Sequence, residues 1–191
     1  MNKLLLLLSF LLLSAASFAQ TGKDTIVYNL PVVNGHLLYA DSINVKGRSA
    51  AQLDSAAKHW FLGYFKNYRL LKLADKKDTA NFIFSEALLE YYLTPGLVPI
   101  KFFAIITLQI DCRNSNYNYK IYNIYFRPKS DFLNSVGYQN DPDYLISIYK
   151  QKHLGFGTSV VVDRKQIRNY LGHMNIEVRK CITSLNKAMA N

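Results

Sequence analysis

The sequence lacks most of the motifs that would indicate a catalytic or metal-binding function. Among 191 residues there are only two cysteines and one tryptophan, and acidic side chains are outnumbered by basic ones, 13 to 23. No Gly-x-Ser-x-Gly sequence is present, so the nucleophile elbow of that class of hydrolases has no candidate. None of the histidines, His36, His59, His153 and His173, stands at a metal-ligand spacing from another ligand residue. The sequence therefore predicts no metal, no cofactor and no catalytic residue.

Long apolar runs are also absent, except for one at the N-terminus. A short positive start precedes an apolar run over residues 4–13, which is followed by small residues up to Ala19. Ser17 and Ala19 take the −3 and −1 positions of a cut before Gln20, which is the layout of a secretory signal peptide. The run has about half of the roughly 20 apolar residues that a membrane-spanning helix needs. We therefore expect cleavage between Ala19 and Gln20, with no transmembrane anchor in the mature chain.

Export changes what the remaining composition implies. Removing residues 1–19 leaves 172 of the 191 residues, enough for a single domain that buries roughly 70% of its unfolded surface without a disulfide staple. Lys3 is the only charge removed, so the formal charge of the mature chain is +9 instead of +10. Its basic residues are dispersed, which argues against nucleic-acid binding. We expect a periplasmic or secreted protein whose partner, not identified by the sequence, belongs to the envelope or the exterior.

Periodicity and turn signals predict the order strand, helix, four strands, insert, helix over residues 20–191. A short strand-like piece at 26–28 precedes the first strand, at 36–45. Ser49 and Gln52 then form a capping box at the start of an amphipathic helix of about 18 residues with a wide aromatic stripe.

Four strands follow this helix, and the last two are expected to pair directly through a loop at 114–116. They are predicted at 70–74, 82–92, 101–113 and 118–127. An insert at about 128–162 contains a short helix from Pro142 and a short strand at 158–162. The last helix begins after Asp163 and runs to about Ala188, because apolar residues recur there at intervals of three and four.

Helices set apart from a mostly antiparallel sheet indicate an α+β domain of two layers, with both helices on one face of the sheet. The segment Val45-Lys46-Gly47-Arg48-Ser49, the helix with Trp60 and the tail at 184–189 resemble a family of exported Bacteroidota proteins of unknown function. The resemblance covers roughly residues 36–190 and implies a TATA-binding-protein-like fold and export. It implies no activity and no site residues.

The two cysteines are both expected in the core. Alternation along 101–113 places Cys112 on an entirely apolar face, and Cys181 lies on the apolar stripe of the last helix. In an exported protein these two residues can form a disulfide, which would close a long loop and add about 4 kcal/mol. The preferred alternative is that both residues are buried free thiols. Counting free thiols under denaturing, non-reducing conditions decides between the disulfide and the free thiols.

The other face of the sheet is expected to combine carboxylates with apolar rings. The residues predicted there as a binding surface are Phe103, Ile105, Glu86, Glu90 and Asp111. Glu86 and Glu90 are four residues apart on one strand, about 13 Å, which is too far for the carboxylate pair of a glycosidase. Exposed apolar area instead favours an interface, unless another segment covers this face. The preferred hypothesis is a non-enzymatic binding domain; the alternative is an envelope hydrolase or carbohydrate-active enzyme that uses these carboxylates.

Overall fold

The computed structural model describes residues 25–71, 81–93, 100–127, 141–150 and 164–191. The expected signal peptide, its cleavage site and the expected strand at 158–162 lie outside these residues. So do residues 72–74 of one predicted strand and most of the insert.

Five strands form one antiparallel sheet in the order β3-β7-β6-β5-β4. They are β3 (Tyr39–Asn44), β4 (Tyr68–Leu70), β5 (Phe82–Leu93), β6 (Ile100–Arg113) and β7 (Asn116–Arg127). Two further short strands, β1 (Val32–Val33) and β2 (His36–Leu37), form a separate hairpin. Within the five-stranded sheet, the predicted order of one strand before the helix that begins at Ala50 and four strands after it is confirmed.

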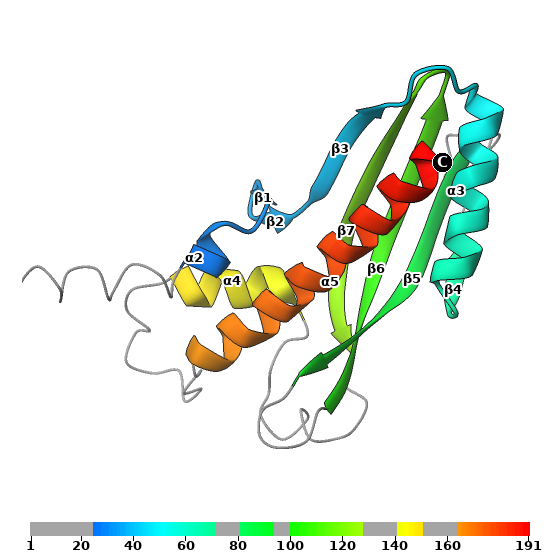
Figure 1. Cartoon of the computed structure of the whole chain (residues 1–191). Coiled ribbons are helices and arrows are strands. Elements are labelled where there is room, and N and C mark those ends of the chain that lie inside the picture. Colours follow the sequence, from blue (N-terminus) through cyan, green and yellow to red (C-terminus); the bar gives the residue numbers. More distant parts are fainter. Residues whose placement is uncertain (1–24, 72–80, 94–99, 128–140, 151–163) are drawn as a thin grey trace, which may run out of the picture.

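Two helices cover one face of this sheet, as predicted. Helix α3 (Ala50–Tyr64) leads from one edge strand to the other, and α5 (Arg164–Ala190) crosses the sheet diagonally beside it (Figure 1). Two shorter helices, α2 (Thr25–Tyr28) and α4 (Pro142–Lys150), pack against α5. Within the described part of the chain, no helix is both long enough and apolar enough to cross a bilayer.

The core lies between the sheet and these helices. On β6 the alternate residues from Phe102 to Cys112 are all at most 8% exposed, which confirms the predicted apolar face. The apolar stripe predicted for α5 is buried as well. Its residues are at most 1% exposed: Leu171, Met174, Val178, Cys181 and Leu185.

The start of α3 is fixed by contacts that the sequence partly predicts. Gln52 N donates to Ser49 Oγ at 3.2 Å and Ser49 N donates to Gln52 Oε1 at 2.8 Å, which is the expected capping box. The amide of Ala50 is satisfied from elsewhere, because it donates to Asn114 Oδ1 in the β6–β7 turn. This turn therefore also anchors the helix.

Three side-chain hydrogen bonds fix the position of α5, two of them to the sheet beneath it and one to α3 beside it. Tyr39 OH donates to Asn175 Oδ1, Tyr117 OH donates to Asn186 Oδ1, and Trp60 Nε1 donates to Ser184 Oγ, at 3.0, 2.6 and 3.1 Å. Each acceptor lies on α5, next to its buried stripe. Polar residues that periodicity assigns only to the flank of a helix thus determine how it is oriented.

Three local predictions were wrong. Residues 26–28 form one helical turn instead of a strand, since Val27 is fully buried and the turn packs against α5. The strand expected at 36–45 is divided at Leu38, whose amide donates to the carbonyl of Pro31. The strand expected at 70–74 begins earlier, as β4 at Tyr68–Leu70, and does not include Leu71. A further feature, on which no prediction was made, is a bulge between Ile105 and Thr107, with Asn123 at a positive φ of 47°, which changes which residues of β7 face the helices.

Candidate functional site

The face of the sheet opposite the helices is the surface that the sequence predicts for binding. Along β5 and β6 the residues on this face alternate with the buried ones, as expected. Among the described residues, α3 and α5 both pack on the other face (Figure 1). We call this surface the open face. Phe103 and Ile105 lie on it and are half-buried, so the structure places both where the sequence predicts them.

Apolar and aromatic side chains gather on β5, β6 and β7 of the open face. Ile105 is paired with Leu88 on one side and with Tyr125 on the other, and Phe103 follows on the same strand. Tyr92 and Tyr125 are 57% and 49% exposed. Cross-strand neighbours of this kind touch through their side chains. We call these residues the aromatic patch: Leu88, Tyr92, Phe103, Ile105, Tyr122 and Tyr125.

The three carboxylates predicted on this face are each paired with a basic side chain. Glu86 lies 2.5 Å from Arg69 of β4, Glu90 lies 2.6 Å from Lys101, and Asp111 lies 3.2 Å from Arg113. Lys101 also stands over the Phe103 ring, 5.3 Å from its centroid. Its hydrogen bond to Glu90 raises the pKa of Lys101. The pairs Glu86–Arg69 and Glu90–Lys101 therefore join neighbouring strands beside the aromatic patch, whereas Asp111 and Arg113 lie on the same strand, away from it.

The register separates these carboxylates along the sheet. Glu86 is paired with Thr107 and Asp111 with Phe82, so Asp111 is displaced four residues from Glu86, in the direction away from Glu90. At about 3.3 Å per residue, each successive pair is about 13 Å apart along the strands. Glycosidases need two carboxyl groups within about 10 Å of each other. The open face thus brings no two of these carboxylates into the arrangement that the hydrolase alternative requires.

Both cysteines lie in the core and are free thiols in the structure. Burial is the main cause that raises the pKa of Cys112 to about 12, with smaller effects from the carboxylates of Asp54 and Asp111. Burial likewise raises the pKa of Cys181 to about 12, opposed by a hydrogen bond with Tyr64. Since the thiolate is the reactive form, neither cysteine is suited to nucleophilic or redox chemistry in this state.

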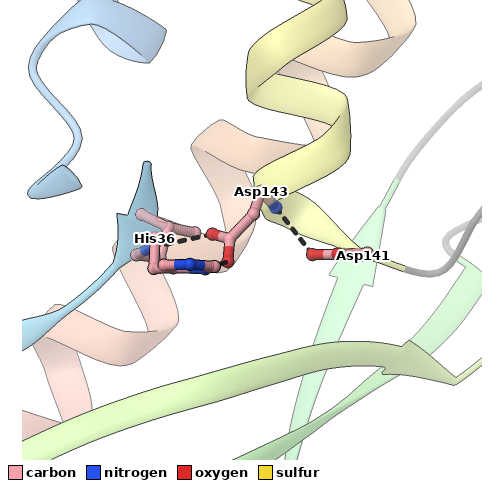
Figure 2. Close-up of polar contacts among 4 residues, drawn as sticks. His36, Asp141 and Asp143 are labelled. Atoms are coloured by element: carbon pink, nitrogen blue, oxygen red, sulfur yellow. Dashed lines mark hydrogen bonds and ion pairs between the residues drawn. The ribbon is translucent and has the colours of Figure 1, made fainter. Parts of the chain in front are cut away.

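The histidines form no metal site within the described residues, where no group of three potential metal-ligand side chains comes together. His36 instead lies next to Asp143 at the start of α4, with Nδ1 2.9 Å from Oδ2 (Figure 2). The other oxygen of Asp143 accepts from the amide of Leu37 at 2.7 Å. Asp143 thereby joins β2 to α4 across 106 residues, which no local pattern in the sequence indicates.

Comparison with solved structures shows that the fold is shared. The structure is similar to that of a TBP-like protein from Parabacteroides distasonis, with a TM-score of 0.62 and 17% identity over 84% of this chain and 97% of that one. It is also similar to a DUF4468 family protein from Bacteroides ovatus, with a TM-score of 0.61 and 12% identity over 85% and 91% of the two chains.

No protein-family model matches the chain, and a search of curated proteins finds no match. The likeness to the two structures confirms the resemblance to Bacteroidota proteins of unknown function with a TATA-binding-protein-like fold. At these identities the likeness concerns the fold, which by itself carries no activity.

Proposed function

We propose that the mature chain is a non-enzymatic, exported domain that binds a protein partner through the open face of its sheet. The observation that carries the proposal is the aromatic patch, which lies on the opposite side of the sheet from both large helices. Contiguous apolar area on a protein surface is typical of an interface. Tyrosine, phenylalanine and arginine are also the residue types that are enriched where proteins bind one another.

The charges on the open face support a protein partner over the alternatives. Glu86, Glu90 and Asp111 are engaged in ion pairs and are far apart, which argues against carboxylate catalysis. Their negative charges also oppose a nucleic-acid backbone, although the fold resembles one that binds DNA. The ion pairs of Glu86 and Glu90, which lie beside the apolar patch, instead correspond to the polar rim of a protein interface.

Site-specific photo-crosslinking in the living cell tests this proposal. A photoreactive phenylalanine replaces Tyr92 or Tyr125 on the open face, or Ile176 on α5 as a control. Ile176 and Tyr125 are both 49% exposed, so differences between these two positions do not reflect access to solvent. We expect a discrete protein adduct from positions 92 and 125 and none from 176. Equal adducts at all positions, or none at any, would contradict the proposal.

The cross-linked partner, once purified, provides the second step. We expect Phe103→Ala and Tyr125→Ala each to weaken its binding by about tenfold, as truncation of a central interface residue does. Lys120→Ala, at an exposed position on the polar part of the same face, is the matched control and should bind almost unchanged.

A further inference from the structure

A groove of about 810 Å³ lies between α3 and α5, on the opposite side of the sheet from the open face. Sequence periodicity assigned the aromatic stripe of α3 to the core alone, and so gave no sign of it. We call its less exposed apolar and aromatic lining residues the floor, namely Ala56, Trp60, Tyr64 and Ala188, and the exposed Gly63 lies beside them on α3. The Trp60 and Tyr64 rings are stacked with centroids 5.4 Å apart, and Trp60 is held by its hydrogen bond to Ser184. The groove is therefore formed by residues that are fixed in place.

Gly63 is a residue whose presence packing does not explain. It lies in the last turns of α3, where glycine is less favourable than alanine because the unfolded chain has more freedom to lose. No atom lies within 4 Å of the position that a Cβ would take. An alanine would thus fit without a clash. Because Gly63 has no side chain, no atoms project from this position into the groove.

The walls of the groove are polar and include two basic residues, Arg48, which is positively charged, and His59. Among the described residues no aspartate or glutamate side chain lines the groove. In the described part of the chain, neither Arg48 nor His59 has an ion-pair partner. The lining also has four uncharged polar side chains, the hydroxyls of Ser55 and Ser184 and the amides of Gln52 and Asn191. Each of these groups can donate and accept hydrogen bonds.

We infer that this groove binds an acidic oligosaccharide. The low apolar floor fits the C–H faces of sugar rings, the neutral amides and hydroxyls fit their hydroxyl groups, and Arg48 and His59 complement the carboxylates or sulfates. From Gln52 to Tyr64 the wall formed by α3 extends about 18 Å at 1.5 Å per residue, so a chain of several sugar rings can lie along it.

Other anionic ligands fit the same lining less well. A peptide gains much of its affinity from main-chain hydrogen bonds, but the interior backbone groups of α3 and α5 are already bonded within their helices. A lipid needs a deep apolar cavity for its acyl chains, whereas this floor is shallow and lies between polar walls. The site is independent of the binding proposed for the open face, since no residue is common to the two surfaces.

The single tryptophan of the sequence makes the groove directly observable, because Trp60 forms part of its floor. The purified mature chain is titrated with a panel of oligosaccharides that carry uronate, sulfate or phosphate groups, together with neutral oligosaccharides of the same length. Binding is followed by tryptophan fluorescence and by calorimetry. We expect saturable binding of at least one acidic oligosaccharide and of none of the neutral ones.

Three variants assign this binding to the groove. Arg48→Gln combined with His59→Gln should weaken it by about tenfold, the usual effect of losing charge-assisted hydrogen bonds. Gly63→Met should abolish it by filling the groove, while the far-ultraviolet circular dichroism stays unchanged and the melting temperature does not fall, because methionine favours a helix more than glycine does. Lys120→Gln, which removes one positive charge from the open face, is the control and should change the affinity little.

Each remaining outcome overturns the inference. If Lys120→Gln weakens binding as much as the groove variants do, the attraction is a general effect of the net charge. If Gly63→Met binds as well as the unsubstituted chain, the ligand lies elsewhere. If polyglutamate binds in place of every acidic oligosaccharide, the groove recognises acidic peptides, and if no anionic ligand of the panel binds, it has no such function. None of these results bears on the cross-linking experiment for the open face.

Discussion

At the scale of single residues, two tyrosines on the helix-facing side of the sheet differ in what their hydroxyl groups contact. Tyr117 donates to Asn186 Oδ1 at 2.6 Å, whereas the buried hydroxyl of Tyr91 has no hydrogen-bond partner among the described residues. Burial raises the pKa of both hydroxyls well above the ordinary value, so both remain protonated. Their rings contribute to the same core, and the difference between them is a single hydrogen bond.

Replacing each tyrosine by phenylalanine isolates that bond. We expect Tyr117→Phe to lower the free energy of unfolding by about 1 kcal/mol, because a hydrogen bond is lost and the Asn186 amide loses its partner. Tyr91→Phe should be neutral or raise it by up to about 1 kcal/mol, since a buried hydroxyl without a partner is removed. Urea unfolding of both variants measures the difference, and equal losses would contradict this explanation.

The cysteines give a prediction with a defined dependence on pH. We expect two free thiols in denaturant without reductant, and no reaction of the native protein with a thiol reagent in mildly alkaline buffer. In the folded protein both pKa values are raised from 9.0 to about 12. Their contribution to stability is therefore complete below pH 9 and is lost as the pH rises from 9 toward 12. A count of no free thiols would establish the Cys112–Cys181 disulfide instead.

At the scale of elements, two glycines near α3 should respond to alanine in opposite ways. Gly63 lies within the helix with open space at its Cβ position, so Gly63→Ala should raise the free energy of unfolding by about 0.5–1 kcal/mol. Gly47 precedes the helix with a φ of +80°, which an alanine side chain strains, so Gly47→Ala should lower it by about 1 kcal/mol. Thermal unfolding measures both, and a stabilising Gly47→Ala would contradict the assigned backbone conformation.

The attachment of α4 depends on one carboxylate. Asp143→Ala removes the acceptor for the partly buried amide of Leu37, so we expect a loss of about 1–2 kcal/mol and faster hydrogen exchange at that amide. His36→Ala should cost less than about 0.5 kcal/mol, because the His36 side chain is 78% exposed and its ion pair with Asp143 is screened by water. If the two variants were equally destabilised, the ion pair and not the amide contact would hold α4.

Element boundaries could be read from the sequence where the cause is local. The start of α3 follows from the side chains of Ser49 and Gln52, and the buried stripe of α5 follows from its periodicity. The bulge at Asn123 could not be read, because it concerns two strands at once. The same holds for the turn at residues 25–28, which has a strand-like composition and is folded by its contact with α5.

At the scale of the whole molecule, export is the prediction that the described residues do not test. We expect the protein recovered from the periplasm or medium to begin at Gln20, as determined by N-terminal sequencing or intact mass. Ala19→Leu should prevent cleavage, because the −1 position accepts only small residues. Recovery of the protein from the cytoplasm with residues 1–19 still attached would contradict the signal peptide and remove the main support for an envelope partner.

The sequence by itself determined the properties that depend on composition and local pattern. These are the α+β class, the capping box of α3 and the alternation that gives the sheet one apolar face. The signal peptide remains a prediction of the same kind. Such features arise from residues close together in the chain, where spacing alone specifies geometry. They predicted Phe103, Ile105 and the three carboxylates on one surface.

Only the tertiary structure decided which side chains lie next to these residues and how far apart the three carboxylates are. Strand register places Asp111 opposite Phe82, far from the other two carboxylates, and brings Arg69 to Glu86 and Lys101 to Glu90. The carboxylates proposed for catalysis are therefore separate and take part in ion pairs. The packing of α5 beside α3 creates a groove around Trp60 that neither helix has alone. Pairing and packing join residues more than a hundred positions apart, such as Trp60 and Ser184, and no local pattern specifies such a distance.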